Sequence, residues 1–111
     1  MAIIDTSTLK ILIESKTPFV LLDARSVKWD DGQRIPGAQS LPNDAPVEQL
    51  TRLNKNSLIV VYCTHSECGA SGRLIHRLNE LGYPFVLKYA EGIQEWIQQG
   101  HPILKEQDEH C

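Results

Sequence analysis

The sequence predicts a single α/β domain built on a parallel sheet with helices on both faces. Two short apolar runs, over residues 19–22 and 58–62, do not alternate with polar residues, which is typical of strands buried on both faces. Amphipathic segments with helical spacing separate the apolar runs, as repeated β-α units require. A chain of 111 residues fits one domain. We therefore expect one domain over residues 1–111, with a core over about 3–103 and a C-terminal tail over 104–111.

The first half of the chain predicts two helices and three strands. A capping Thr6 or Ser7 begins a helix that ends near residue 15, because the apolar residues at 9, 12 and 13 recur at helical spacing. The buried strand over 19–22 follows this helix. A short strand over 38–41 and a helix over about 46–53 come next, and Pro46 suits the first turn of that helix. The second buried strand, over 58–62, continues the β-α alternation.

The second half of the chain predicts a helix, a strand and a final helix. Apolar residues recur with a period of 3.6 from position 70 to position 81, and the glycine at 82 ends that helix. A strand over about 85–89 leads to a helix over about 92–99, which the glycine at 100 stops. This last helix is expected to bury Ile93, Trp96 and Ile97.

Composition and charge favour a globular protein whose partners are small molecules or other proteins. Hydrophobic residues are 41% and charged residues 23% of the chain, close to the averages for globular proteins. The net charge of −3 and the scattered basic residues give no footprint for nucleic acid or an anionic membrane. No apolar run approaches the roughly 20 residues that span a bilayer, and no basic leader precedes an apolar stretch. The expected location is the cytoplasm.

The three cysteines, Cys63, Cys68 and Cys111, are too few and too unevenly spaced for a secreted disulfide framework. Reactive thiols in a reducing compartment fit the pattern better. No second pair of Cys or His stands at zinc-finger spacing, so no metal site is expected. Cys111, at the chain terminus, is expected to have no role.

The strongest signal for chemistry is the segment from Cys63 to Gly69, between the second buried strand and the helix after it. In an open α/β sheet, ligands bind outside the carboxyl ends of the strands, near helix N-termini with unpaired N–H groups. A thiol in such a place can have its pKa lowered from about 8.5 into the range of about 3.5–7.5. We therefore expect Cys63 to be a nucleophilic thiolate and the curled loop to aim backbone amides at an anion.

Five short motifs, in one order along nearly the whole chain, resemble the rhodanese family. They are Asp23-Ala24-Arg25, Ile35-Pro36-Gly37-Ala38, Val61-Tyr62-Cys63, Leu81-Gly82-Tyr83, and Glu91-Gly92-Ile93 with Trp96. The resemblance implies a central five-stranded parallel sheet and a sulfurtransferase in which Cys63 accepts a sulfane sulfur as a persulfide. The implied donor is thiosulfate, polysulfide or a similar compound, and the implied acceptor is a small thiol, cyanide or a protein thiol. It implies no cofactor.

The resemblance also assigns roles around this nucleophile. The loop residues that bind the substrate or its anion are Thr64, His65, Ser66, Glu67, Cys68 and Gly69. Asp23, Arg25 and Arg34 are expected to support the site, the first two by fixing loops through charge-assisted hydrogen bonds. His65 is either a proton-transfer group or an exposed loop residue, and Trp29 either walls the pocket mouth or pins its own loop.

Two departures from the family pattern change what the site is expected to do. Many members place a basic residue in this loop, which here contains Glu67 and no Lys or Arg, so we expect weak turnover with dianionic thiosulfate. Cys68 takes the sixth loop position, where many members have Arg, and this Cys-x4-Cys spacing resembles a subset of single-domain rhodaneses. Cys68 is then either a packing residue or a resolving thiol that attacks a Cys63 persulfide, expels hydrosulfide and leaves a disulfide.

Two other functions stay open at this point. A non-catalytic rhodanese-like module could carry sulfur, sense oxidation or bind a partner protein. A Cys-dependent phosphatase or arsenate reductase needs an Arg at the end of a Cys-x5-Arg loop, where this chain has Gly69. Arg73 lies one helical turn further on, and spacing alone does not decide whether it reaches back to the loop.

Overall fold

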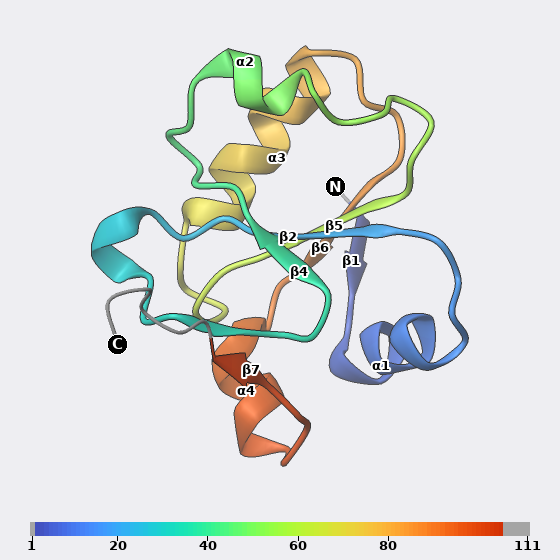
Figure 1. Cartoon of the computed structure of the whole chain (residues 1–111), viewed down its shortest axis with the longest axis vertical. Helices are drawn as coiled ribbons and strands as arrows, with labels where there is room; N and C mark the ends of the chain where they lie inside the picture. The colour runs from blue at the N-terminus through green and yellow to red at the C-terminus, as the bar shows by residue number, and fades with distance from the viewer. Residues whose placement is uncertain (1, 106–111) are drawn as a thin grey trace.

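A five-stranded parallel sheet forms the centre of the computed structural model, which describes residues 2–105 (Figure 1). The strand order is β1–β6–β5–β2–β4, and each strand is parallel to its neighbours. The strands are β1 (Ala2–Ile4), β2 (Val20–Asp23), β4 (Ala38–Ser40), β5 (Ile59–Tyr62) and β6 (Val86–Tyr89). All four residues of the middle strand β5 are buried. The predicted α/β class and the parallel sheet are confirmed.

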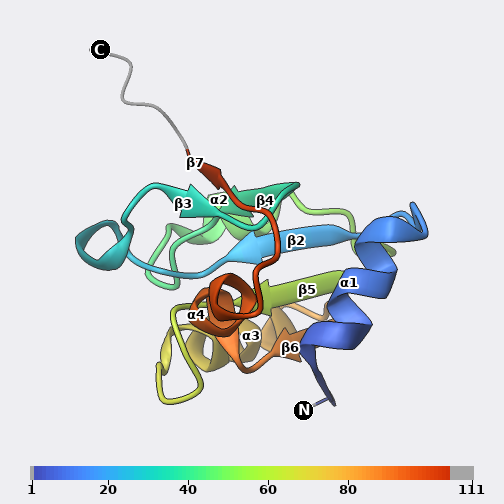
Figure 2. The same cartoon turned by 90° about the horizontal axis from the view of Figure 1, so that it is seen from below.

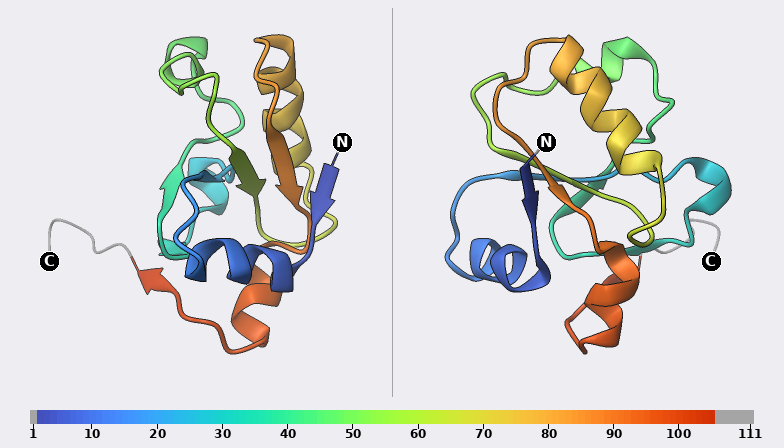
Figure 3. Two further views of the ribbon diagram at one scale, coloured as in Figure 1. Left: turned by 90° about the vertical axis from the view of Figure 1, so that its right-hand side faces the viewer. Right: turned by 180° about the vertical axis from the view of Figure 1, so that it is seen from behind.

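Helices cover both faces of the sheet, as predicted. Helices α1 (Thr6–Glu14) and α4 (Gly92–Gln98) lie on one face, and α2 (Val47–Leu50) and α3 (Ala70–Glu80) lie on the other (Figures 2 and 3). Because side chains alternate along a strand, Val60 and Tyr62 of β5 pack with α1 and α4, whereas Ile59 and Val61 pack with α2 and α3. Of the described residues, no helix is long and apolar enough to span a bilayer.

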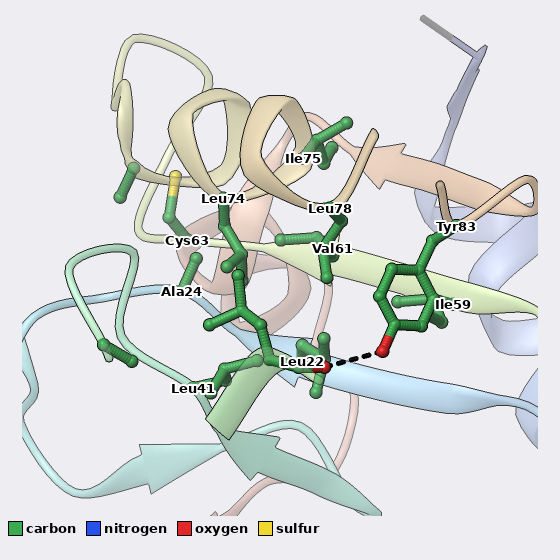
Figure 4. Packing of buried hydrophobic residues seen from close by; sticks show 13 residues of the cluster. Leu22, Ala24, Leu41, Ile59, Val61, Cys63, Leu74, Ile75, Leu78 and Tyr83 are labelled. Atoms are coloured by element: carbon green, nitrogen blue, oxygen red, sulfur yellow. Dashed lines mark hydrogen bonds between the residues drawn. The ribbon is translucent and has the colours of Figure 1, made fainter. Parts of the chain in front are cut away.

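The apolar cluster under α2 and α3 contains the predicted nucleophile at one end. Figure 4 shows Cys63 beside Ala24 and Leu74, at the end of the cluster that is far from Tyr83. Tyr83 closes the other end, and its hydroxyl donates to the Leu50 carbonyl oxygen at 2.7 Å. The backbone position of Cys63 is therefore fixed by the core, while its sulfur lies at the carboxyl edge of the sheet.

The sequence pattern does not locate three short strands, β1, β3 and β7. The edge strand β1 has three residues, and Ile3 is 63% exposed, so β1 carries neither a long apolar run nor an alternating one. Strands β3 (Gln33–Arg34) and β7 (Leu104–Lys105) pair antiparallel in a separate two-stranded sheet. Strand β7 lies inside the segment expected to be a C-terminal tail, so ordered structure continues past residue 103. Residues 106–111, with Cys111, are outside the described residues.

Three details of the predicted helices are wrong. The N-cap of α1 is Asp5 rather than Thr6 or Ser7, and its side chain accepts the Thr8 N–H at 2.9 Å. Helix α2 ends at Leu50 rather than near residue 53, because the following residues form tight turns with bonds such as Leu53 N to Leu50 O at 3.2 Å. Ile97 was expected in the core but is 38% exposed. Ile93 and Trp96 occupy the stripe of this short helix that faces the sheet, and Ile97 stands in its last turn.

Candidate active site

A pocket of about 600 Å³ opens at the carboxyl edge of the sheet, beside the loop that joins β5 to α3. The loop contributes four lining residues, and the rest come from the segments after β2 and β4 and from the starts of α3 and α4. The lining residues are Arg25, Ser26, Trp29, Asn43, Asp44, Thr64, His65, Cys68, Gly69, Ala70, Arg73 and Gln94. The pocket stands where the strand order of an open α/β sheet places ligands.

Cys63 lies beneath this pocket and does not line it. It is 1% exposed. Its Sγ is 3.5 Å from the Cys68 carbonyl oxygen and 3.5 Å from Ser71 Oγ. Burial, together with a hydrogen bond to the Cys68 side chain, raises the pKa of the Cys63 thiol above its ordinary value. The expectation of a lowered pKa at this position is wrong, because the packing of α3 and α4 around the loop removes solvent from the sulfur.

Cys68 lines the pocket, and the pKa of its thiol lies below its ordinary value. Its partial burial raises the thiol pKa, but hydrogen bonds from Cys63 and from the backbone N–H groups of Ala70 and Thr64 lower it further than burial raises it. The positive charge of Arg73 acts in the same direction. Backbone amides therefore act on both cysteines of the loop, since the Ser71 N–H also lowers the pKa of Cys63.

Arg73 reaches back over the end of the loop, a point that spacing left open. Its Nε donates to Asn43 Oδ1 at 3.1 Å, which holds the side chain across the pocket wall. A Cβ atom added at Gly69 would lie only 2.8 Å from Arg73 Nη1, so a side chain at position 69 would displace the guanidinium. Gly69 thus makes room for the Arg73 guanidinium beside Cys68.

The remaining loop residues divide between the pocket and the solvent. Thr64 and His65 line the pocket, and His65 Nδ1 accepts the Glu67 N–H at 3.2 Å, which shapes the turn. Ser66 and Glu67 are exposed and do not line this pocket. Glu67 therefore does not contribute its charge to the wall of this pocket.

Helix α4 holds the loop between β5 and α3 in place through the backbone N–H groups at its start. The N–H of Ile93 donates to the Cys63 carbonyl oxygen at 3.0 Å, and the N–H of Gln94 donates to the Thr64 carbonyl oxygen at 3.0 Å. Gly92 lets the two segments approach this closely. The start of α4 therefore sets the position of the Cys63 backbone.

Replacing Gly92 by Ala is expected to lower the free energy of unfolding by about 2–5 kcal/mol, and the loop is expected to move. Gly92 has φ +78°, and a Cβ there would lie 2.6 Å from the Thr64 carbonyl carbon and oxygen. The matched control is Gly100→Ala, where φ is +80° but nothing lies within 4 Å, so only about 1–2 kcal/mol should be lost. Urea unfolding measures both values, and equal losses would show that the contact with the loop does not matter.

Asp23, Arg25 and Arg34 form a buried ion network beside the pocket. Asp23 Oδ2 lies 2.6 Å from Arg25 Nη2 and 3.2 Å from Arg34 Nη1. Arg34 Nη2 also pairs with Asp30 Oδ2 at 2.6 Å, and the hydrogen bond from Arg34 holds the pKa of Asp30 below its usual range. Of the three network residues named first, Arg25 alone lines the pocket. The network ties β2 to the turn η1 (Val27–Trp29) and β3, a geometry that fits a supporting role.

The pocket contains residues that sequence reasoning did not single out. Asn43, Asp44 and Gln94 line it, and Ser71 contacts the Cys63 sulfur. Asn43 and Asp44 follow the end of a strand, and Gln94 lies near the start of a helix. These positions are the only signal in the sequence that points to a role at the site. Trp29 is 68% exposed and lines the pocket, so it walls the mouth. Among residues 2–105, no cluster of His, Cys, Asp and Glu side chains is arranged to hold a metal ion.

Comparison with family models matches residues 5–99 to the rhodanese-like domain. Among curated proteins, no match is found. The BH2092 protein from Bacillus halodurans has a similar structure, with TM-score 0.84 and 24% identity over 94% of this chain and 77% of that chain. The rhodanese-like domain of the Alr3790 protein from Anabaena sp gives TM-score 0.81 and 25% identity, over 95% and 80%. A thiosulfate sulfurtransferase from Pseudomonas aeruginosa gives TM-score 0.74 and 21% identity, over 96% of this chain and 21% of that chain.

Proposed function

The chain belongs to the rhodanese-like domain family, and from this premise we propose that it is a sulfurtransferase that works through a persulfide on Cys63. The observation that carries the proposal is the position of Cys63. Its backbone is fixed at the carboxyl end of the central strand, directly below a pocket large enough for a small donor. The Ser71 hydroxyl and backbone N–H both stabilise the charged form of its sulfur.

Sulfur transfer needs two displacements and no cofactor. In the first, the enzyme thiolate attacks the outer sulfur of the donor, and the donor's sulfur bond breaks as its leaving group departs with the electron pair. In the second, an acceptor thiol or cyanide attacks the outer sulfur of the persulfide, and the Cys63 thiolate leaves. The pocket serves both steps, since it is the opening through which donor and acceptor reach the loop.

The proposal is tested by measuring the intact mass of the protein after incubation with thiosulfate, polysulfide or the methanethiosulfonate anion. We expect a gain of one sulfur atom that cyanide removes as thiocyanate. Cleavage after Glu67 separates Cys63 from Cys68, so peptide mapping should find the resting persulfide on Cys63. A protein that gains no sulfur from any of these donors is not a sulfurtransferase.

Arg73 should favour anionic donors. We expect Arg73→Gln to slow sulfur loading from thiosulfate about 3–10-fold at low salt, relative to loading from the singly charged methanethiosulfonate, because a pocket cation attracts a dianion more strongly. The matched control is Glu67→Gln, which changes a charge outside the pocket and should alter the ratio by less than twofold. If Glu67→Gln has the larger effect, the loop charge and not Arg73 controls donor choice.

A non-catalytic sulfur carrier or protein-binding module is the second candidate. One observation that favours it is the burial of Cys63. The other is a pair of large apolar side chains on the turn beside the pocket, Val27 and Trp29, which are 84% and 68% exposed. Such a module would form the Cys63 persulfide but would not turn over with cyanide or a small thiol. Steady-state thiocyanate formation therefore separates the two functions.

A further inference from the structure

We propose that Cys68 is the thiol that first takes sulfur from the donor and that the sulfur then moves inward to Cys63, an inference that rests on the proposed function. The sequence pattern points to the reverse order, with Cys68 acting second as a resolving thiol. Three features of the site favour Cys68 as the entry thiol: its access to the pocket, the groups around its sulfur, and its contact with Cys63.

Access to the pocket differs between the two thiols. Cys68 is part of the pocket wall and is partly exposed, whereas Cys63 is 1% exposed and does not line the pocket. A donor that fills the pocket contacts Cys68 without any movement of the loop. To reach Cys63 it would have to displace Cys68, whose own carbonyl oxygen lies 3.5 Å from the Cys63 sulfur.

The groups around Cys68 stabilise a negative charge on its sulfur. The backbone N–H groups of Ala70 and Thr64 and the positive charge of Arg73 all lower the pKa of the Cys68 thiol. Asn43 holds Arg73 in this place, and Gly69 leaves the space for it. A nucleophile is most reactive as a thiolate, so these contacts give Cys68 the first attack.

The first step creates a persulfide on Cys68. With a thiosulfonate donor, the Cys68 thiolate attacks the outer sulfur, a new Sγ–S bond forms, and the bond from that sulfur to the sulfonyl group breaks. The electron pair of the broken bond leaves with the sulfinate. One thiolate and one thiosulfonate anion become one persulfide anion and one sulfinate, so charge is conserved and no separate oxidant or reductant is needed.

The second step moves the sulfur to Cys63 without a further reagent. The Cys63 sulfur attacks the outer sulfur of the Cys68 persulfide, and Cys68 Sγ is the leaving group. The Cys63 sulfur lies 3.5 Å from the Cys68 carbonyl oxygen, and the proton of the Cys63 thiol passes to the departing Cys68 sulfur. The products are a Cys63 persulfide anion, supported by Ser71, and a neutral Cys68 thiol.

Single variants in a Cys111→Ser background test the order of the two thiols. The probe is methanethiosulfonate, with rapid acid quenching and peptide mapping after cleavage at Glu67. Cys63→Ser should gain one cyanide-removable sulfur on Cys68 at close to the parent rate, because serine retains a hydrogen-bond donor. Cys68→Ser should load Cys63 at least about tenfold more slowly. Cys63→Ala provides a second variant if the serine variant does not fold.

The opposite pattern overturns the inference. If Cys68→Ser loads at the parent rate and neither Cys63 variant gains sulfur, Cys63 reacts first, and the proposed sulfurtransferase function still stands. If the parent protein itself gains no sulfur, the proposed function fails and the inference fails with it. A Cys63–Cys68 disulfide with release of hydrosulfide, in place of a Cys63 persulfide, would also overturn the transfer step.

The dependence of loading on pH gives a second readout. The rate follows the thiolate, which accumulates as pH rises through the pKa of the attacking group. The pKa of Cys68 is lowered and that of Cys63 is raised, so parent loading should reach half its plateau below the ordinary thiol pKa. In Cys68→Ser the midpoint should move to higher pH, and an unchanged midpoint would contradict attack by Cys68.

Discussion

A variant with both Cys63 and Cys68 replaced by serine is expected to lose sulfur transfer, with a fall in turnover of about 10³-fold or more. These are the two thiols at the pocket and directly beneath it, and every step of the proposed transfer passes through one or both of them. A serine hydroxyl stays protonated at neutral pH and cannot hold a sulfane sulfur. Thiocyanate formation from each donor in the presence of cyanide measures the loss.

The fold should survive this double replacement. Each serine is slightly smaller than cysteine, and a hydroxyl at position 63 has the Cys68 carbonyl oxygen and Ser71 Oγ within reach as partners. We expect a loss of about 1–2 kcal/mol in the free energy of unfolding. Cys111→Ser is the control and should leave turnover unchanged. Turnover within tenfold of the parent in the double variant would show that the activity does not depend on these thiols.

Replacing Asp23 by Ala is expected to lower the free energy of unfolding by about 3–5 kcal/mol, because it removes the carboxylate between two buried guanidinium groups. Asp23, Arg25 and Arg34 have side chains that are 1%, 2% and 4% exposed. Asp23 accepts from Arg25 Nη2 at 2.6 Å and from Arg25 Nε at 3.0 Å. Without it, both cations would be left buried with fewer partners, and urea unfolding should show the loss directly.

Asp31→Ala is the matched control for this network. Asp31 also pairs with Arg25, at 3.0 Å, but its side chain is 56% exposed, so its removal should cost about 1 kcal/mol or less. Equal losses in the two variants would mean that burial of the network does not set its strength. Because Arg25 lines the pocket, Asp23→Ala should also slow sulfur loading at temperatures where it is still folded.

The architecture could be predicted from the sequence because its signals are local. Strand β5 is buried on both faces, and such a strand shows in the sequence as an uninterrupted apolar run. Helix α3 covers one face with a stripe of apolar residues at helical period, which is equally visible along the chain. The place of Cys63 after a central strand followed from these two elements. The resemblance to rhodaneses rested on the order of short motifs.

Elements whose partners are far away in the sequence were not visible in it. Strand β1 exists because Ala2–Ile4 pairs with β6, more than eighty residues later, and its own three residues carry no pattern. Strand β7 depends in the same way on β3, whose residues Gln33 and Arg34 lie about seventy positions earlier. Short edge strands take their conformation from the partner backbone, so the sequence of the strand itself decides little.

The sequence by itself determined that a cysteine stands at the carboxyl end of a central strand in a parallel α/β domain; only the tertiary structure decided which thiol faces the pocket. Cys63 and Cys68 are five positions apart in one loop, and spacing cannot tell which will be buried. Helix α4 holds the Cys63 carbonyl from below, while Arg73 from α3 reaches back toward Cys68. Burial and charge at a sulfur are set by whatever packs around it, and here those groups come from separate elements that meet only in the folded chain.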